Sequence, residues 1–324
     1  MPLDFTLPSS RLATLRNALV VVPDAPAIFR VEGNGAFTCL QGLFTCDLAM
    51  VGDGSLSWGA LLTPKGMIVF DAWVLREGDR FTLIAEASAR NAAIELFRRT
   101  LPPRLARITD LSESHRVAWL LGGAGSDVVV NAAAGPVPEV GRVTRVGSER
   151  ENLLTAGGPL APFTFLAVGP SNQLAQFTGE LHRGGGVGGT GDDLAAARIL
   201  AGWPTLGREI DDKTLPQEVR FDDLGGVSYT KGCYTGQETV ARVHFRGHVN
   251  RTLRGVVFDH PGPFEDRVIR EGEKEVGTVR SALLLDEQVV ALAMIRREIG
   301  DGASLSAGNR SLRVMDLPLT AVAA

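Results

Sequence analysis

Residues 231–238 read Lys-Gly-Cys-Tyr-Thr-Gly-Gln-Glu, and this octapeptide is the most informative stretch of the chain. Thr235 and Glu238 have the spacing of a capping box ahead of an apolar run, which predicts that a helix begins here. Cys233 would then lie near the positive end of the helix dipole, with Lys231 two residues before it. Both features favour a thiolate, so Cys233 is a candidate nucleophile or soft metal ligand, with Lys231 as its activator. The alternative is a buried cysteine in a glycine-rich turn, and the local sequence leaves both open.

Positive charge gathers between Lys231 and Arg254. This segment holds five lysines and arginines and one acid, Glu238, so its charge is five minus one, or +4, in a chain whose net charge is −4. Such an island attracts carboxylates or phosphates. The alternative is a solvated helix face followed by an edge strand.

The cysteines indicate a reducing compartment rather than a disulfide framework. There are three in 324 residues, and we expect Cys39 and Cys46 to be small core residues. Cys233 could be combined with His244 and His248 as a zinc site, but these give only three candidate ligands. We therefore expect no metal site.

The composition is that of a globular protein with two or three domains. The chain shows no signal peptide and no apolar stretch of membrane-spanning length, so we expect a cytoplasmic protein without a membrane partner. The net charge of −4 argues against a dedicated nucleic-acid binder. We also expect a monomer.

Short apolar runs separated by turn residues predict an α+β fold rather than repeated βαβ units. In the first third, the predicted strands are 27–31, 56–62, 67–76 and 81–85, and the predicted helices are 36–43 and 88–100. Regularly spaced runs at 253–258, 275–281, 289–295 and 311–315 predict a small terminal β-barrel. We expect residues 1–115 plus 190–250 to form the core domains, 116–189 a second α+β domain and 251–324 the barrel.

The octapeptide, together with the residues that follow it as far as Arg251, resembles the signature of the YgfZ family. These are folate-binding relatives of the glycine-cleavage T-protein, implicated in assembling or repairing iron–sulfur enzymes. Further similar pieces are Gln41–Asp47, Leu62–Gly66 with Asp71, Arg198–Pro204 and Pro216–Glu218. The resemblance covers most of the chain and is weakest over 120–190. It implies a three-domain ring around a central folate channel, with a β-barrel at the C-terminal end.

The chain departs from the T-protein at two places. T-proteins carry an adjacent pair of acids where this chain has Phe70 and Asp71, and a pterin-binding glutamate where it has Leu200. Losing one acid weakens the case for aminomethyl transfer, which needs a placed carboxylate for proton movement. Losing the glutamate leaves the mode of pterin binding open.

The resemblance therefore implies a tetrahydrofolate-binding protein that aids iron–sulfur cluster assembly or repair through Cys233. Its partners would be a reduced folate and iron–sulfur client or assembly proteins. The implied folate-site residues are Asp71 for the pterin, Lys65, Arg198 and Arg242 for the glutamate tail, and Tyr229, Gln237 and Glu238 in addition. Two alternatives remain, namely a folate-dependent aminomethyl- or methyltransferase and a folate sensor whose cysteine is structural. We do not expect a turnover aminomethyltransferase.

Overall fold

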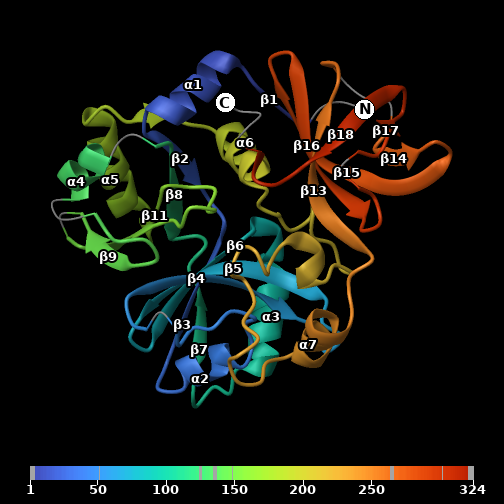
Figure 1. Ribbon diagram of the computed structural model, residues 1–324. Helices are drawn as coiled ribbons and strands as arrows, with labels where there is room; N and C mark the ends of the chain where they lie inside the picture. Colours follow the sequence, from blue (N-terminus) through green and yellow to red (C-terminus); the bar gives the residue numbers. More distant parts are fainter. Residues whose placement is uncertain are drawn as a thin grey trace.

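Three β-sheets meet around helix α6 (Gly191–Ala201), and together they confirm the predicted α+β class. In Figure 1 the first sheet lies at the bottom, the second at the left and a barrel at the upper right. The computed structural model describes residues 4–50, 52–123, 126–133, 137–147, 149–262, 266–300 and 302–319.

The first sheet has the strand order β4-β5-β6-β3-β7. Its strands are β3 (Ala27–Glu32), β4 (Ser55–Leu62), β5 (Ile68–Glu77), β6 (Arg80–Ala85) and β7 (Arg107–Asp110), and its helices are α2 (Ala36–Gln41) and α3 (Arg90–Thr100). Because side chains alternate along β5, Phe70 enters the core beneath α3 whereas Asp71 and Trp73 lie on the opposite face. That opposite face is directed toward α6 and contributes Asp71 and Trp73 to the candidate site.

The second sheet has the order β12-β2-β8-β11-β10-β9. Its strands are β2 (Val20–Asp24), β8 (His115–Leu121), β9 (Val143–Val146), β10 (Asn152–Ala156), β11 (Phe165–Pro170) and β12 (Val187–Gly188), and α4 (Ser126–Ala133) and α5 (Ser171–Arg183) accompany it. Strand β2 pairs with β8, so the chain starts this sheet, builds the first sheet and then returns.

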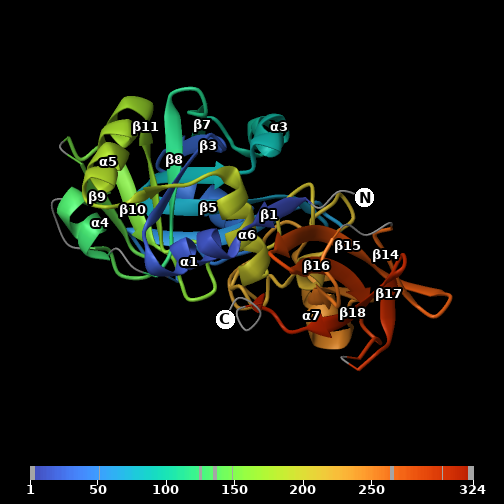
Figure 2. The same cartoon turned by 90° about the horizontal axis from the view of Figure 1, so that it is seen from above.

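The terminal strands form the predicted barrel. They are β13 (Arg251–Phe258), β14 (Val268–Glu271), β15 (Lys274–Leu285), β16 (Gln288–Arg296), β17 (Leu305–Ala307) and β18 (Arg310–Met315). Strand β15 pairs with both β14 and β16, which closes the barrel, and β1 (Phe5–Leu7) adds to β15 in parallel. Helix α1 (Ser9–Asn17) follows β1. Figures 1 and 2 place α6 between the second sheet and the barrel, and α6 contacts both.

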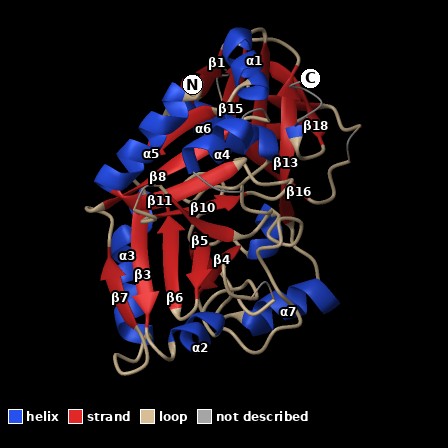
Figure 3. Cartoon of the chain, turned by 90° about the vertical axis from the view of Figure 1, so that its left-hand side faces the viewer, coloured by secondary structure: helices blue, strands red, loops and turns tan. Residues whose placement is uncertain are grey.

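Between α6 and β13 the chain covers the inner face of the first sheet with a 3₁₀ turn (Pro216–Val219) and helix α7 (Gln237–Arg246). Figure 3 shows α7 and α2 at the same end of this sheet. The predicted capping box of Thr235 and Glu238 is wrong, because α7 begins at Gln237 after Gly236, with no side-chain cap. Gly236 has φ +82°, and a Cβ there would lie 2.6 Å from the carbonyl oxygen of Thr63. The close approach of the β4–β5 hairpin therefore requires glycine and decides where the helix starts.

Candidate functional site

The predicted site residues separate into two places. Asp71 and Arg198 lie together in a chamber beside α6, whereas Cys233 is exposed on the loop before α7. The resemblance had implied one folate site for Asp71, Arg198, Lys65 and Arg242, and had left open whether Cys233 faces it.

The chamber lies where the first sheet, the second sheet and α6 meet, and it holds about 20 Å³. That is about the room needed for one water molecule. Its charged lining residues are Asp24, Asp71, Glu86 and Arg198, and its indole rings are those of Trp73, Trp119 and Trp203. The remaining tryptophan of the chain, Trp58, donates its Nε1–H to Asp71. All four tryptophans thus surround one chamber, a signal that the sequence analysis did not use.

Asp71 has one satisfied and one unsatisfied oxygen. Trp58 Nε1 lies 2.9 Å from Oδ2, whereas the buried Oδ1 has no hydrogen-bond partner among the described residues. Burial raises the pKa of Asp71 to about 6. A buried acceptor without a donor costs roughly 1–3 kcal/mol, so this oxygen is suited to accept a hydrogen bond from a bound group.

Helix α6 holds Arg198 in place. The helix begins with a capping box of Thr190 and Asp193 and ends at Gly202, whose φ of +68° favours glycine. Arg198 Nη1 donates to Glu86 Oε1 at 2.7 Å, and its guanidinium lies 5.7 Å from the centre of the Trp119 ring.

A second cavity, of about 330 Å³, adjoins the chamber and shares Glu86, Arg198 and Trp203 with it. The exposed Arg208 lines its rim, 4.7 Å from the centre of the Phe5 ring. No sequence motif singled out Glu86 or Arg208. Glu86 follows β6 and Arg208 follows α6, and only the folded chain brings these two segments to the same cavity.

The same cavity also contains a buried acid, Glu209. Ser281 Oγ donates to its Oε1 at 2.5 Å and the Thr205 amide donates to its Oε2 at 3.0 Å. Burial raises the pKa of Glu209. Both oxygens are therefore satisfied, which makes Glu209 part of the wall rather than a free acceptor like Asp71.

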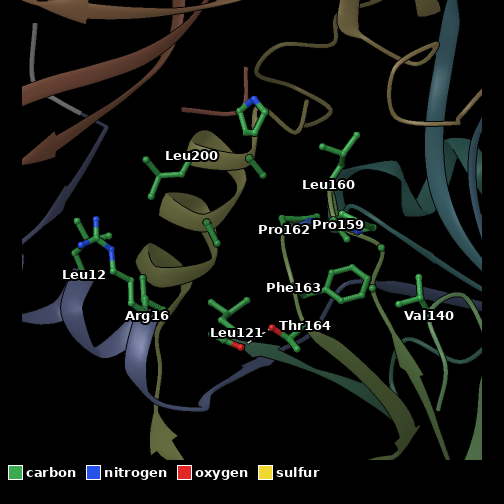
Figure 4. Close-up of a pocket in the computed structure, with 18 residues that line it drawn as sticks. Leu12, Arg16, Leu121, Val140, Pro159, Leu160, Pro162, Phe163, Thr164 and Leu200 are labelled. Carbon is green, nitrogen blue, oxygen red and sulfur yellow. Dashed lines mark hydrogen bonds between the residues drawn. The ribbon is translucent and has the colours of Figure 1, made fainter. Parts of the chain in front are cut away.

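A wider cavity of about 680 Å³ borders the other side of α6 (Figure 4). Leu200 lines it because two residues along a helix turn the side chain about 200° away from Arg198. Its lining is mainly leucine, proline, alanine and glycine, and Arg16 is its one ionisable lining residue. The leucine that replaces the T-protein glutamate thus faces apolar space. Phe163 in this cavity packs edge-on against Trp73, which lines the chamber, with ring centres 4.9 Å apart.

Lys231, the predicted activator of Cys233, is buried and fully engaged. Its Nζ lies 2.6 Å, 2.6 Å and 2.8 Å from the carbonyl oxygens of Gln41, Phe44 and Cys46. An ammonium group has three hydrogens, so these three bonds leave none for the Cys233 sulfur. Burial lowers the pKa of Lys231 to about 8.

The other predicted folate residues lie around α7. Lys65, Glu238 and Arg242 are exposed, and Gln237 is half-buried. Lys65 belongs to the β4–β5 hairpin, which packs against the start of α7 through Gly66 and Thr239. These residues are therefore neighbours of the Cys233 loop and do not line the chamber of Asp71.

Tyr229 is occupied by contacts within the chain. Its hydroxyl donates to Asp222 Oδ1 at 2.5 Å and accepts from Gln217 Nε2 at 3.2 Å. Its ring stacks on His244, with centres 3.7 Å apart. This arrangement ties the Tyr229 segment to α7.

Three of the five cations of the predicted positive island have partners within the chain. Arg251 bonds Glu218 at 2.9 Å, Arg254 approaches Asp316 at 3.8 Å and Lys231 is buried among carbonyls. Exposed cations remain at Arg242 and Arg246 on α7. The residues that the structure describes contain no group of three or more His, Cys, Asp or Glu side chains arranged to hold a metal. No helix within them is long and apolar enough to cross a membrane.

Two family models and several known proteins are similar to this chain. Residues 22–136 match the GCVT N-terminal domain and residues 250–319 match the CAF17 C-terminal beta-barrel domain. The chain is 27% identical over 304 residues to the tRNA-modifying protein YgfZ of Cronobacter sakazakii, covering 90% of each chain. It is 28% identical over 277 residues to the protein of the same name from Escherichia coli O157:H7, covering 83% of this chain and 82% of the other.

The solved structures identify the fold. The glycine cleavage system aminomethyltransferase T of Bartonella henselae superposes with a TM-score of 0.82 and 18% identity, covering 95% of this chain and 88% of the other. The predicted T-protein-like ring with a C-terminal barrel is therefore confirmed.

Proposed function

We propose that this chain, a protein of the YgfZ type with the fold of the glycine-cleavage T-protein, binds a reduced folate and supports iron–sulfur cluster assembly or repair through Cys233. The folate would lie beside α6, in the cavity that adjoins the Asp71 chamber. The thiol of Cys233 would act at the exposed surface near α7.

The observation that carries the folate assignment is that Asp71 Oδ1 has no hydrogen-bond partner within the described part of the chain. A pterin ring presents N–H and amino donors in one plane, which match a carboxylate that lacks a donor. The chamber itself holds about one water molecule, so the ring would occupy the adjoining 330 Å³ cavity and direct its donors toward Asp71. Arg208 at the rim is suited to a carboxylate of the glutamate tail. The wide apolar cavity lacks an acid in its lining and fits these donors less well.

The location of Cys233 supports a role toward another protein. The residue is exposed on the loop before α7 and does not line the Asp71 chamber. An exposed thiol can reach a cluster or a damaged partner, which a thiol enclosed with folate cannot. The relatives are named tRNA-modifying proteins; for this chain we propose that any contribution to tRNA modification passes through a protein partner, since its net charge is −4.

Titration calorimetry with tetrahydrofolate tests the folate assignment. We expect micromolar binding by the wild-type chain and a loss of about tenfold or more in Asp71→Asn, because the amide places an N–H donor in the chamber. Asp79→Asn, a change of the same kind in the β5–β6 turn, should bind like the wild type. Absence of binding by the wild-type chain, or equal binding by Asp71→Asn, would contradict the assignment.

A further inference from the structure

We propose that Lys231 is a positioning residue: it fastens the Cys233 loop to the C-terminal end of helix α2, so that residues 41–47 and 226–235 form one unit. The inference deepens the proposed function, on which it rests for the role of Cys233. It concerns how the thiol is presented, rather than how it is ionised.

The first observation is the set of acceptors around the Lys231 ammonium. Its three hydrogen bonds run to carbonyl oxygens of residues 41, 44 and 46, and the side chain is 7% exposed. The Tyr234 ring lies on another side, 4.9 Å from Nζ to its centre. The acceptors are 185 to 190 residues away in sequence, so the ammonium joins two distant segments. We call the three carbonyls and the Tyr234 ring the Lys231 cage.

The cage coincides with a helix end. Gln41 is the last residue of α2, and carbonyls in the last turn of a helix lack partners within the helix. The Lys231 ammonium satisfies the Gln41 carbonyl and complements the negative end of the helix dipole, and its other two acceptors, Phe44 and Cys46, lie in the turn after the helix. Asp47 adds an anion nearby: although burial works in the opposite direction, hydrogen bonds and the charge of Lys231 lower its pKa.

Additional bonds hold the two segments together on both sides of Cys233. Before it, the Ser228 amide donates to the Thr45 carbonyl at 2.9 Å, and Thr45 Oγ1 donates to the Gly226 carbonyl at 2.5 Å. After it, the Thr235 amide donates to the Gly42 carbonyl at 3.2 Å. Cys233 is thus exposed, together with Gly232, between two attachment points, Lys231 and Thr235.

This arrangement gives the early segment 41–47 a function. It supplies a carbonyl cage for the lysine of the octapeptide, and the cage sets the position of the thiol two residues later. A cation whose three hydrogens all bind carbonyls cannot also donate to the Cys233 sulfur. Positioning and activation of the thiol therefore predict different behaviour in the same variant.

Hydrogen exchange of the full chain, without folate, tests the proposal. In Lys231→Met the apolar side chain keeps its length but leaves three carbonyls without a donor. We expect amide exchange in residues 41–47 and 226–235 to rise at least tenfold, with exchange in β15 and β16 unchanged. Lys213→Met, which removes an exposed lysine, should exchange like the wild type. If Lys231→Met fails to fold, Lys231→Arg keeps the charge and should raise exchange in the same two segments by a smaller factor.

The pH profile of Cys233 alkylation separates this role from the alternatives. We expect its midpoint to be the same in Lys231→Met and the wild type. A shifted midpoint with unchanged exchange would instead identify an activator, and a uniform rise in exchange would identify a general stabilising residue. Either result overturns the proposal. Because no folate is present, the outcome does not depend on the folate assignment.

Discussion

Arg198 Nη1 lies 2.7 Å from Glu86 Oε1, and this ion pair joins helix α6 to the end of β6. The pair stands beside Asp71, where Glu86 raises the pKa of the acid and Arg198 lowers it, both after the larger effect of burial. The two charges act in opposite directions, and burial has the largest effect on the pKa of Asp71, opposed in part by the hydrogen bond from Trp58. The predictions on the pH dependence of folate affinity and of stability follow from the state of Asp71.

Arg208 at the proposed folate cavity and Arg242 on α7 should contribute differently to folate binding. Arg208→Ala removes the exposed cation at the rim of the 330 Å³ cavity, and we expect it to weaken binding of a polyglutamylated tetrahydrofolate about tenfold. Arg242→Ala, an equal loss of charge on α7, should have a much smaller effect. Calorimetry at two salt concentrations measures both. A larger loss of affinity in Arg242→Ala would instead indicate that the glutamate tail binds at the Cys233 surface.

Folate affinity should depend on pH through Asp71. The ionised carboxylate accepts the pterin donors, so affinity should fall about tenfold per pH unit as the pH drops below about 6. Asp71→Asn should lack this dependence. Calorimetry from pH 5 to pH 8 with both proteins checks it, and parallel curves would contradict the role of Asp71.

The contribution of Asp71 to folding stability should change with pH in the direction opposite to that of folate affinity. Burial raises the folded-state pKa of Asp71 from 3.8 to about 6, so between these values the folded chain binds more protons than the unfolded one. The stabilisation is full below the unfolded pKa and is lost as the pH rises through about 6, on the order of 3 kcal/mol at most. Urea unfolding of the wild type and Asp71→Asn at pH 4 and pH 7 measures this as a difference between the two proteins. The wild type should lose more stability over that interval than the variant.

The three cysteines should react in the order of their exposure. Cys233 is exposed, Cys39 is half-buried and Cys46 is buried, with burial raising the pKa of Cys46 to about 12. Alkylation followed by peptide mass spectrometry should therefore modify Cys233 first and Cys46 last.

Cys233→Ser should preserve folding and folate affinity, because its side chain is exposed and outside the chamber. It should fail to restore iron–sulfur enzyme activity in cells that lack the protein. Cys39→Ser is the matched control and should restore that activity. Full complementation by Cys233→Ser would make the thiol structural and favour a folate sensor.

Restoring the second acid of the T-protein should not create a transferase. Phe70 is fully buried and packs edge-on against Phe97, with ring centres 5.9 Å apart. Phe70→Asp should cost about 3–5 kcal/mol of stability and yield no methylenetetrahydrofolate from a lipoylated partner protein. Denaturant unfolding and a coupled assay measure the two outcomes. A robust rate from either the wild type or the variant would favour the aminomethyltransferase alternative.

The sequence by itself predicted several of the strands and the similarity to YgfZ proteins. The strands at 56–62 and 253–258 are confirmed, because a short apolar run between turn residues is a local property of the sequence. The octapeptide indicated similarity to YgfZ proteins, which the sequence comparison confirms. That similarity predicted the T-protein fold, which the superposition confirms.

Tertiary structure decided the chemical surroundings of those residues. Sequence spacing placed a capping box at Thr235, but the carbonyl of Thr63 requires glycine at the helix start. The charge count from Lys231 to Arg254 predicted an anion site. The Lys231 ammonium instead donates to backbone carbonyl oxygens up to 190 residues away. A charge acts on whatever lies within a few ångströms, and only the folded chain determines which partners those are.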